Sequence, residues 1–227
     1  MDAKGLTVTI LLGLLTLALF LAVDLVAAGQ LDYWQAWAQA AALGTFMAAG
    51  FLFVPEVDQL AKERAAPGPG AKPWDIVFLG FFFVFYFAVM VVAGLDVGRF
   101  HWTGRLCVSV YVLAYVGYVS SCAAMMWAMR VNRFFSSVVR IQTERGHRVI
   151  DTGPYAWVRH PGYVGALLYV PCTALTLGSL WALLPAVAIL AALIVRTYLE
   201  DETLKSELPG YKDYATRVRW RLVPGLW

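Results

Sequence analysis

The chain alternates long apolar segments with short polar ones. A helix that crosses a bilayer needs about 20 mostly apolar residues. Six segments approach or exceed that length, and they cover residues 6–28, 36–54, 75–95, 105–129, 163–178 and 180–199. The last two are joined by only Gly178 and Ser179, which predicts a tight helical hairpin. The pattern therefore predicts an all-α integral membrane protein, a bundle of about six transmembrane helices with a C-terminal helical hairpin.

Composition excludes an ordinary soluble domain. Of the 227 residues, 60% are hydrophobic and 15% are charged, and the mean hydropathy is +0.65. We expect one structural domain, in which residues 1–130 form an N-terminal four-span region and residues 131–227 form a C-terminal region. The net charge of +3 is small and no basic run is present, so a nucleic-acid partner is not expected. The three cysteines and three histidines show no metal-ligand spacing, so no metal site is expected.

Positively charged residues predict the orientation of the bundle. Lysine and arginine are concentrated in the polar connecting loop at 55–74, in residues 130–160 and in the C-terminal tail, whereas the turns at 29–35 and 178–179 carry none. Cytoplasmic loops of membrane proteins carry an excess of these residues. Both termini and both polar segments are therefore predicted to face the cytoplasm. A chain rich in Ala, Leu and Val with short loops is typical of a bacterial inner membrane protein.

Two acidic residues lie near the ends of predicted spans. Asp24 is close to the end of the first span, and Asp96 directly follows the third. Because an isolated charge is costly in hydrocarbon, both are expected to be exposed to the lipid headgroups.

Residues 142–163 are the least membrane-like part of the interior of the chain. Charged or titratable side chains are dense on and beside this segment, namely Arg140, Glu144, Arg145, His147, Arg148, Asp151, Arg159 and His160. Glycines and prolines interrupt the segment, and lipid cannot solvate irregular backbone that carries so much charge. The segment is therefore predicted to lie at a water interface or to line a polar cavity.

A second polar segment follows the hairpin. It contains Arg196 and then the acidic run Glu200, Asp201 and Glu202, and Arg196 and Glu200 are one helical turn apart on the same face. One reading is a surface ion pair with arginines at the membrane interface. The other is a site for a small polar ligand with a sugar, an amino acid end and a cationic centre, because carboxylates, arginine and tyrosine rings recognise those groups.

The residues of the two polar segments resemble the isoprenylcysteine carboxyl methyltransferase family and, more broadly, membrane methyltransferases that include the phospholipid N-methyltransferases. The similar pieces are GHRVIDTGPYAWVRHPGYVG at 146–165 and RTYLEDETL at 196–204, followed by Tyr211, Tyr214, Arg217 and Pro224. The resemblance covers the chain from Asn132 onward, whereas the first four spans are similar only in being hydrophobic.

This resemblance implies a cytoplasmic pocket for S-adenosylmethionine, which leaves as S-adenosylhomocysteine, and a lipophilic substrate that enters from the bilayer. The implied cofactor contacts are Gln142, His147, Arg148, Val149, Ile150, Tyr155, His160, Pro161, Gly162, Tyr163 and Glu200. Arg196 and Arg159 are the implied catalytic residues, and Arg196 and Asp201 are the implied substrate-side residues. Asp201 stands where the family has a second glutamate, and Leu208-Pro209 replaces a Phe-Gly pair.

The methyl acceptor and two other functions stay open. A carboxylate or thiolate acceptor needs no general base, and no base is evident apart from Glu200 or Asp201, which favours an anionic or thiol acceptor over an amine. Sterol reductases share a similar hairpin but use NADPH, and the Lys-Tyr-Gly element of their tail is missing from SELPGY. A non-catalytic accessory protein is the third reading, against which stands the cost of gathering polar groups at a membrane.

Overall fold

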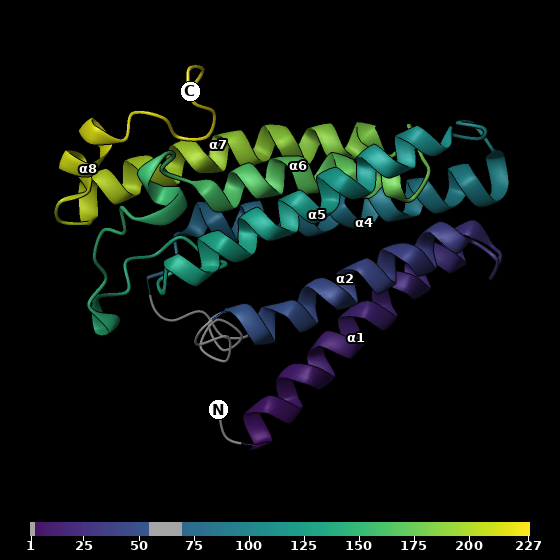
Figure 1. The fold of residues 1–227 in the computed structure, drawn as a ribbon, viewed down its shortest axis with the longest axis horizontal. Helices are drawn as coiled ribbons and strands as arrows, with labels where there is room; N and C mark the ends of the chain where they lie inside the picture. The colour runs from purple at the N-terminus through teal and green to yellow at the C-terminus, as the bar shows by residue number, and fades with distance from the viewer. Residues whose placement is uncertain (1–2, 55–69) are drawn as a thin grey trace.

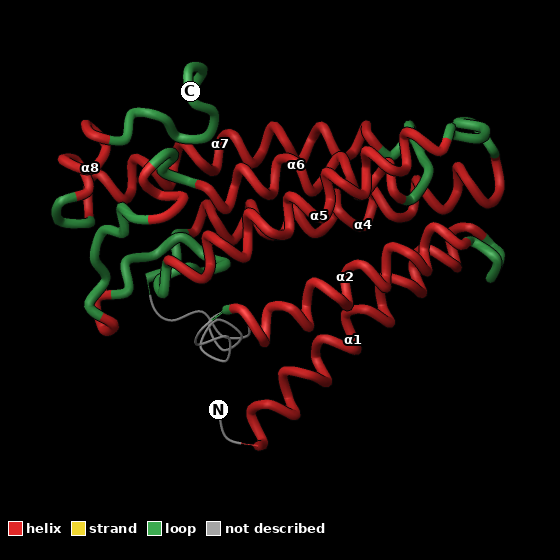
Figure 2. The backbone as a smooth tube through the Cα atoms, in the orientation of Figure 1, coloured by secondary structure: helices red, strands yellow, loops and turns green. Residues whose placement is uncertain are grey.

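The computed structural model describes residues 3–54 and 70–227, and these residues form helices and loops without strands (Figure 2). The helices are α1 (Ala3–Ala28), α2 (Trp34–Phe53), α4 (Pro73–Leu95), α5 (Val108–Val131), α6 (Pro161–Thr176), α7 (Leu183–Glu207) and α8 (Tyr211–Arg217). Short 3-10 turns occur at Thr143–Arg145 and Gly153–Ala156, and a π-helical turn at Asp96–Phe100 extends α4. Most of the connecting loop expected at 55–74 lies outside the described residues. The predicted all-α fold is confirmed.

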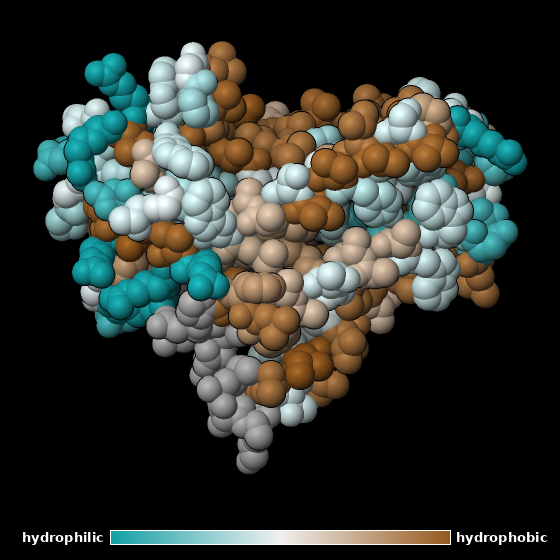
Figure 3. Space-filling model, viewed as in Figure 1, coloured by the Kyte–Doolittle hydropathy of each residue, from teal (hydrophilic) through white to brown (hydrophobic). Residues whose placement is uncertain are grey.

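Five of the described helices are long and apolar enough to cross a membrane. They are Gly5–Ala28, Trp34–Phe53, Pro73–Phe100, Val108–Val131 and Leu183–Glu207. The fifth apolar segment, predicted at 163–178, forms α6, which has only 16 residues and ends before the turn at Gly178. At 1.5 Å per residue α6 is about 24 Å long, shorter than the ~30 Å hydrocarbon layer. Figure 3 shows hydrophobic residues over the middle of the bundle and hydrophilic residues at both ends.

The bundle is a layer of four helices with a diverging hairpin on one side. Helices α4, α5, α6 and α7 lie side by side, with α5 against α6 and α4 against α7 (Figure 1). Helix α1 packs on α4 near the closed end of the α1–α2 hairpin, and the other ends of α1 and α2 diverge from the layer (Figure 1). Close approach requires Gly98, since a Cβ there would lie 2.3 Å from the carbonyl oxygen of Ala28.

The expectation that Asp24 and Asp96 are exposed at the headgroups is wrong, because both side chains are buried inside the protein. Asp96 accepts hydrogen bonds from the Thr103 backbone at 2.8 Å and from the Ser179 hydroxyl at 2.5 Å, so it fixes the hairpin turn to the end of α4. Asp24 is only 3% exposed and lines a small cavity between α1, α2, α4 and α6. Its Oδ1 has no hydrogen-bond partner among the described residues. Sequence position alone did not show that both carboxylates face inward.

Candidate functional site

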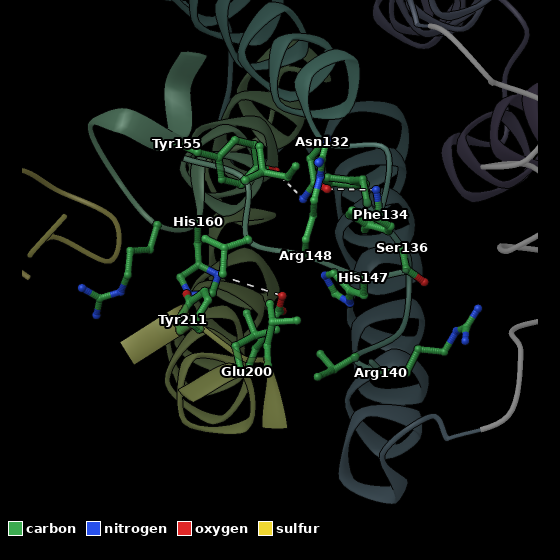
Figure 4. A pocket seen from close by; sticks show the side chains of 18 of the residues that line it. Asn132, Phe134, Ser136, Arg140, His147, Arg148, Tyr155, His160, Glu200 and Tyr211 are labelled. Atoms are coloured by element: carbon green, nitrogen blue, oxygen red, sulfur yellow. Dashed lines mark hydrogen bonds and ion pairs between the residues drawn. The ribbon is translucent and has the colours of Figure 1, made fainter. Parts of the chain in front are cut away.

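A polar cavity lies at the end of the bundle where the segment between α5 and α6 meets α7 and α8. Figure 4 shows His160, Tyr211 and Glu200 on one side of this cavity and Phe134 and His147 on the other. The empty space, including the open mouth, is about 810 Å³. Ten of the residues that the sequence predicted for the site line this cavity: His147, Arg148, Val149, Ile150, Tyr155, Arg159, His160, Gly162, Tyr163 and Glu200. The two polar segments that sequence analysis singled out therefore meet in one cavity.

Four other expected residues lie next to the cavity without lining it. These are Gln142, Pro161, Arg196 and Asp201. Pro161 occupies the first turn of α6, where its missing N–H costs no helical hydrogen bond. It therefore sets where α6 begins and which residues of its first turn, such as Gly162 and Tyr163, reach the cavity.

One wall of the cavity is organised by Gln142 and His147. Gly146 takes a left-handed conformation (φ 62°) after the short 3-10 turn, and the chain folds back so that the Gln142 backbone N–H donates to His147 Nδ1 at 3.3 Å. The Gln142 amide donates to the Phe134 carbonyl at 2.7 Å, and the Phe134 ring stacks on His147 with centroids 4.6 Å apart. Gln142 thus supports this wall from behind.

His147 is a neutral donor at this wall. Burial, followed by the charges of Arg140 and Arg145, lowers the pKa of His147 to about 4. Because Nδ1 accepts from the backbone, the proton of the neutral ring is on Nε2.

The opposite wall presents a carboxylate among aromatic rings. The Tyr163 hydroxyl donates to Glu200 Oε2, and the His160 ring stacks on Tyr163 with centroids 5.7 Å apart. His160 Nδ1 lies 4.0 Å from Glu200 Oε1, and the Glu200 side chain keeps 23% of its surface exposed. Tyr155 lines the same cavity, and its hydroxyl accepts from Asn132 at 3.2 Å. Glu200 is therefore positioned but still accessible to a ligand.

Asp201 and Arg159 form a buried clamp behind this wall. The Asp201 carboxylate is fully buried and accepts from Arg159 Nε at 2.7 Å and Nη2 at 2.9 Å. The other polar groups within 3.3 Å of this carboxylate belong to His160, Lys205, Tyr211 and Arg221. A carboxylate with so many donors is fully satisfied, so its contacts are structural.

The same clamp holds the C-terminal tail. Arg159 Nη1 donates to the carbonyls of Val218 and Arg219 at 2.7 and 2.8 Å. The backbone N–H groups of Arg159 and His160 donate to the carbonyls of Trp220 and Arg221 at 2.9 and 3.0 Å. The tail beyond α8 is non-helical and lies against the Arg-His-Pro turn, so the turn and the tail form one unit.

Arg196 is held by a residue that sequence analysis did not identify, Asp75. Arg196 Nε and Nη2 donate to the two Asp75 oxygens at 2.7 and 3.1 Å, and Nη2 also donates to the Ser137 carbonyl at 2.6 Å. The guanidinium lies over the rings of Phe78 (4.6 Å) and Tyr163 (5.3 Å). In the sequence Asp75 is simply the first residue of the third predicted span. An acidic residue within a membrane-spanning segment is nevertheless a reason to look for a partner of opposite charge.

The fold and cavity define an all-α integral membrane protein with a cavity lined by polar and aromatic residues at one end of its bundle. Residues 110–206 match the family model described as the isoprenylcysteine carboxyl methyltransferase (ICMT) family. The matched residues run from the start of α5 to the end of α7 and cover less than half of the chain, so this part of the chain is similar to that family.

One solved structure has a similar fold. It is described as "Structure of the eukaryotic intramembrane Ras methyltransferase ICMT (isoprenylcysteine carboxyl methyltransferase) without a monobody". The TM-score is 0.51 at 17% sequence identity, over 93% of this chain and 74% of that one. At this identity the likeness shows the fold alone. No curated protein matches the chain.

Proposed function

We propose that the protein is an S-adenosylmethionine-dependent methyltransferase that transfers a methyl group to a lipophilic acceptor from the bilayer. The observation that carries this proposal is Glu200, an accessible carboxylate fixed by Tyr163 between aromatic rings in a cavity at the end of a membrane bundle. The similarity of residues 110–206 to a methyltransferase family supports methyl transfer as the reaction.

The residues of the cavity fit the parts of this cofactor. Glu200 is suited to ribose hydroxyls or an ammonium group, and the rings of Tyr155, Tyr163 and Tyr211 are suited to a cation. Arg148 is exposed at the cavity and has no hydrogen bond or ion pair with a described residue, so its guanidinium is available to a carboxylate. Val149, Leu204 and Leu208 add an apolar surface for a base. Neutral His147 offers a hydrogen-bond donor without adding positive charge near a sulfonium.

The reaction needs alignment more than proton transfer. When bound, the cofactor would supply an electrophilic methyl group on a positively charged sulfur, which needs an acceptor aligned with it. The protein's contribution is to hold the acceptor in line with that methyl group and to exclude water. We propose that Arg196, whose guanidinium lies against the Tyr163 ring, is on the side of the site from which the methyl acceptor enters. The contacts of Arg159 with Asp201 and the tail favour a positioning role for Arg159 instead.

The excess of lysine and arginine at this end of the bundle supports a cytoplasmic location for the cavity and both termini. Composition supports a bacterial inner membrane. Isoprenoid acids, small prenylated thiols and lipid amines are the acceptor classes to test, with anionic and thiol groups favoured.

Purified protein in detergent tests the cofactor. We expect S-adenosylhomocysteine to raise the melting temperature and to bind in calorimetry, whereas NADPH does neither. Glu200→Gln should weaken binding at least tenfold, because one hydrogen bond to a charged group contributes about 1.5–3 kcal/mol. Glu202→Gln is the matched control, since Glu202 is the exposed second neighbour and pairs with Lys205.

Methyl transfer is then tested with cofactor labelled on the methyl group and a membrane lipid extract, followed by identification of the labelled product. Binding of NADPH with no response to S-adenosylhomocysteine would support the reductase reading and overturn the proposal.

A further inference from the structure

Asp75 lies in the first turn of α4, in the N-terminal region that the family model does not cover. Its carboxylate is fully buried, and both oxygens accept from the Arg196 guanidinium. Asp75 Oδ2 also accepts from the Val139 backbone N–H at 2.6 Å, and Val139 lines the cavity. One side chain thus connects α4, α7 and the cavity wall.

A second acidic residue, Glu200, lies close to the Arg196 guanidinium that Asp75 neutralises. Glu200 follows Arg196 by four residues on α7, so the two side chains lie on one helix face with Cβ atoms about 5–6 Å apart. Both also contact Tyr163, Arg196 through the ring and Glu200 through the hydroxyl. In a site of low dielectric a guanidinium freed from Asp75 is strongly attracted to the nearest remaining carboxylate.

In the structure, the Arg196 guanidinium pairs with Asp75 and not with Glu200. The two-point fork with Asp75, the bond to the Ser137 carbonyl and the stacking on Phe78 fix the guanidinium plane on the α4 side. Glu200 keeps Tyr163 as its hydrogen-bond donor and stays open to the cavity.

We propose that Asp75 is a positioning residue that holds Arg196 away from Glu200 and so keeps the Glu200 carboxylate free for the cofactor. This inference rests on the proposed function, because it assigns Glu200 to cofactor binding. It gives the N-terminal region a part in the site, since α4 supplies the carboxylate that sets the charge balance around Glu200.

The test is a cycle of variants measured by calorimetry with S-adenosylhomocysteine. Asp75→Asn should weaken binding at least tenfold, because Arg196 then pairs with Glu200. The double variant Asp75→Asn/Arg196→Gln, in which no guanidinium competes, should bind within threefold of the unaltered protein. A purely structural role for Asp75 predicts the opposite, since a second substitution at the same contact does not restore binding.

Asp96→Asn is the matched control. Asp96 is another fully buried acid next to α4, at the far end of the bundle, and its loss should leave the binding constant unchanged. If Asp75→Asn is not recovered folded, Asp75→Glu replaces it. Glu keeps the charge but displaces the fork by a methylene, and the weakened binding should again be restored by Arg196→Gln.

The outcomes separate the two proposals. Binding by Asp75→Asn equal to that of the unaltered protein, or binding by the double variant as weak as by Asp75→Asn, overturns the role of Asp75 while cofactor binding stands. No binding of S-adenosylhomocysteine by the unaltered protein overturns the proposed function, and the role of Asp75 with it.

Discussion

Neutralising Asp201 should release the C-terminal tail. Asp201→Asn leaves the guanidinium of Arg159 buried without its partner, since the Arg159 side chain is 4% exposed and that of Asp201 is fully buried. Breaking a buried ion pair by removing one member costs about 3–5 kcal/mol. The contacts of Arg221 and Lys205 with the same carboxylate weaken as well. We therefore expect the loss of stability to reach about 3–5 kcal/mol.

Hydrogen exchange reports this release at two amides. The N–H groups of Arg159 and His160 donate to the carbonyls of Trp220 and Arg221, so they are protected only while the tail is docked. Since each 1.4 kcal/mol is a factor of ten, a loss of about 3–5 kcal/mol accelerates their exchange by about 100- to 4,000-fold, up to the limit set by the opening equilibrium of the unaltered protein.

The control is Asp213→Asn, which alters an exposed residue of α8 and should leave both amides protected. An acceleration below tenfold in Asp201→Asn would refute the idea that the Asp201 clamp holds the tail.

Two further predictions concern buried groups. Asp24→Leu should stabilise the protein by about 1–3 kcal/mol in detergent unfolding, because a buried carboxyl whose Oδ1 lacks a partner is replaced by an apolar group of similar size. Lowering the pH from about 6.5 to 4 should weaken both folding and cofactor binding through His147, whose pKa is about 4 in the folded protein, below its ordinary value of 6.5. The unfolded chain binds this proton first, so the stability from a neutral His147 is complete above pH 6.5 and is lost as the pH falls toward 4. His147→Gln should flatten that part of the pH profile, measured as melting temperature and as affinity for S-adenosylhomocysteine.

Each of these two predictions has its own control. Asp32→Leu alters an exposed acid in the loop between α1 and α2 and should not stabilise the protein. Destabilisation by Asp24→Leu would show that the Asp24 carboxyl is satisfied in a way that the geometry does not reveal. His101→Asn, at an exposed histidine, should keep the pH dependence, and a profile unchanged in His147→Gln would remove His147 as its source.

The sequence predicted which segments form the site because polar groups stand out in an apolar chain. The meeting of Tyr163 and Glu200 could be anticipated from the hairpin, which brings the start of α6 beside the end of α7. The residues that line the cavity between His147 and Tyr163 followed from the family resemblance and from the irregular, charged backbone. Their individual roles, and a division of the chain at residue 130, stay predictions.

The partners of buried charges could not be predicted. Arg196 pairs with a residue 121 positions away, and hydrophobic helices give no periodic signal of which face turns inward. The same limit explains the errors at Asp24 and Asp96. The sequence also did not distinguish a ligand-binding role for Arg159 and Asp201 from the tail clamp that they form, because the clamp depends on main-chain carbonyls beyond α8.

The shortness of α6 has a consequence for how a lipophilic acceptor would reach the cavity under the proposed function. A helix of about 24 Å cannot place one end at each surface of a bilayer whose oily interior is ~30 Å thick. Either the lipid around it thins or one of its ends is submerged. Where the lipid thins, or where the submerged end is the first turn with Gly162 and Tyr163, a membrane-anchored acceptor would need less displacement toward water to reach the cavity.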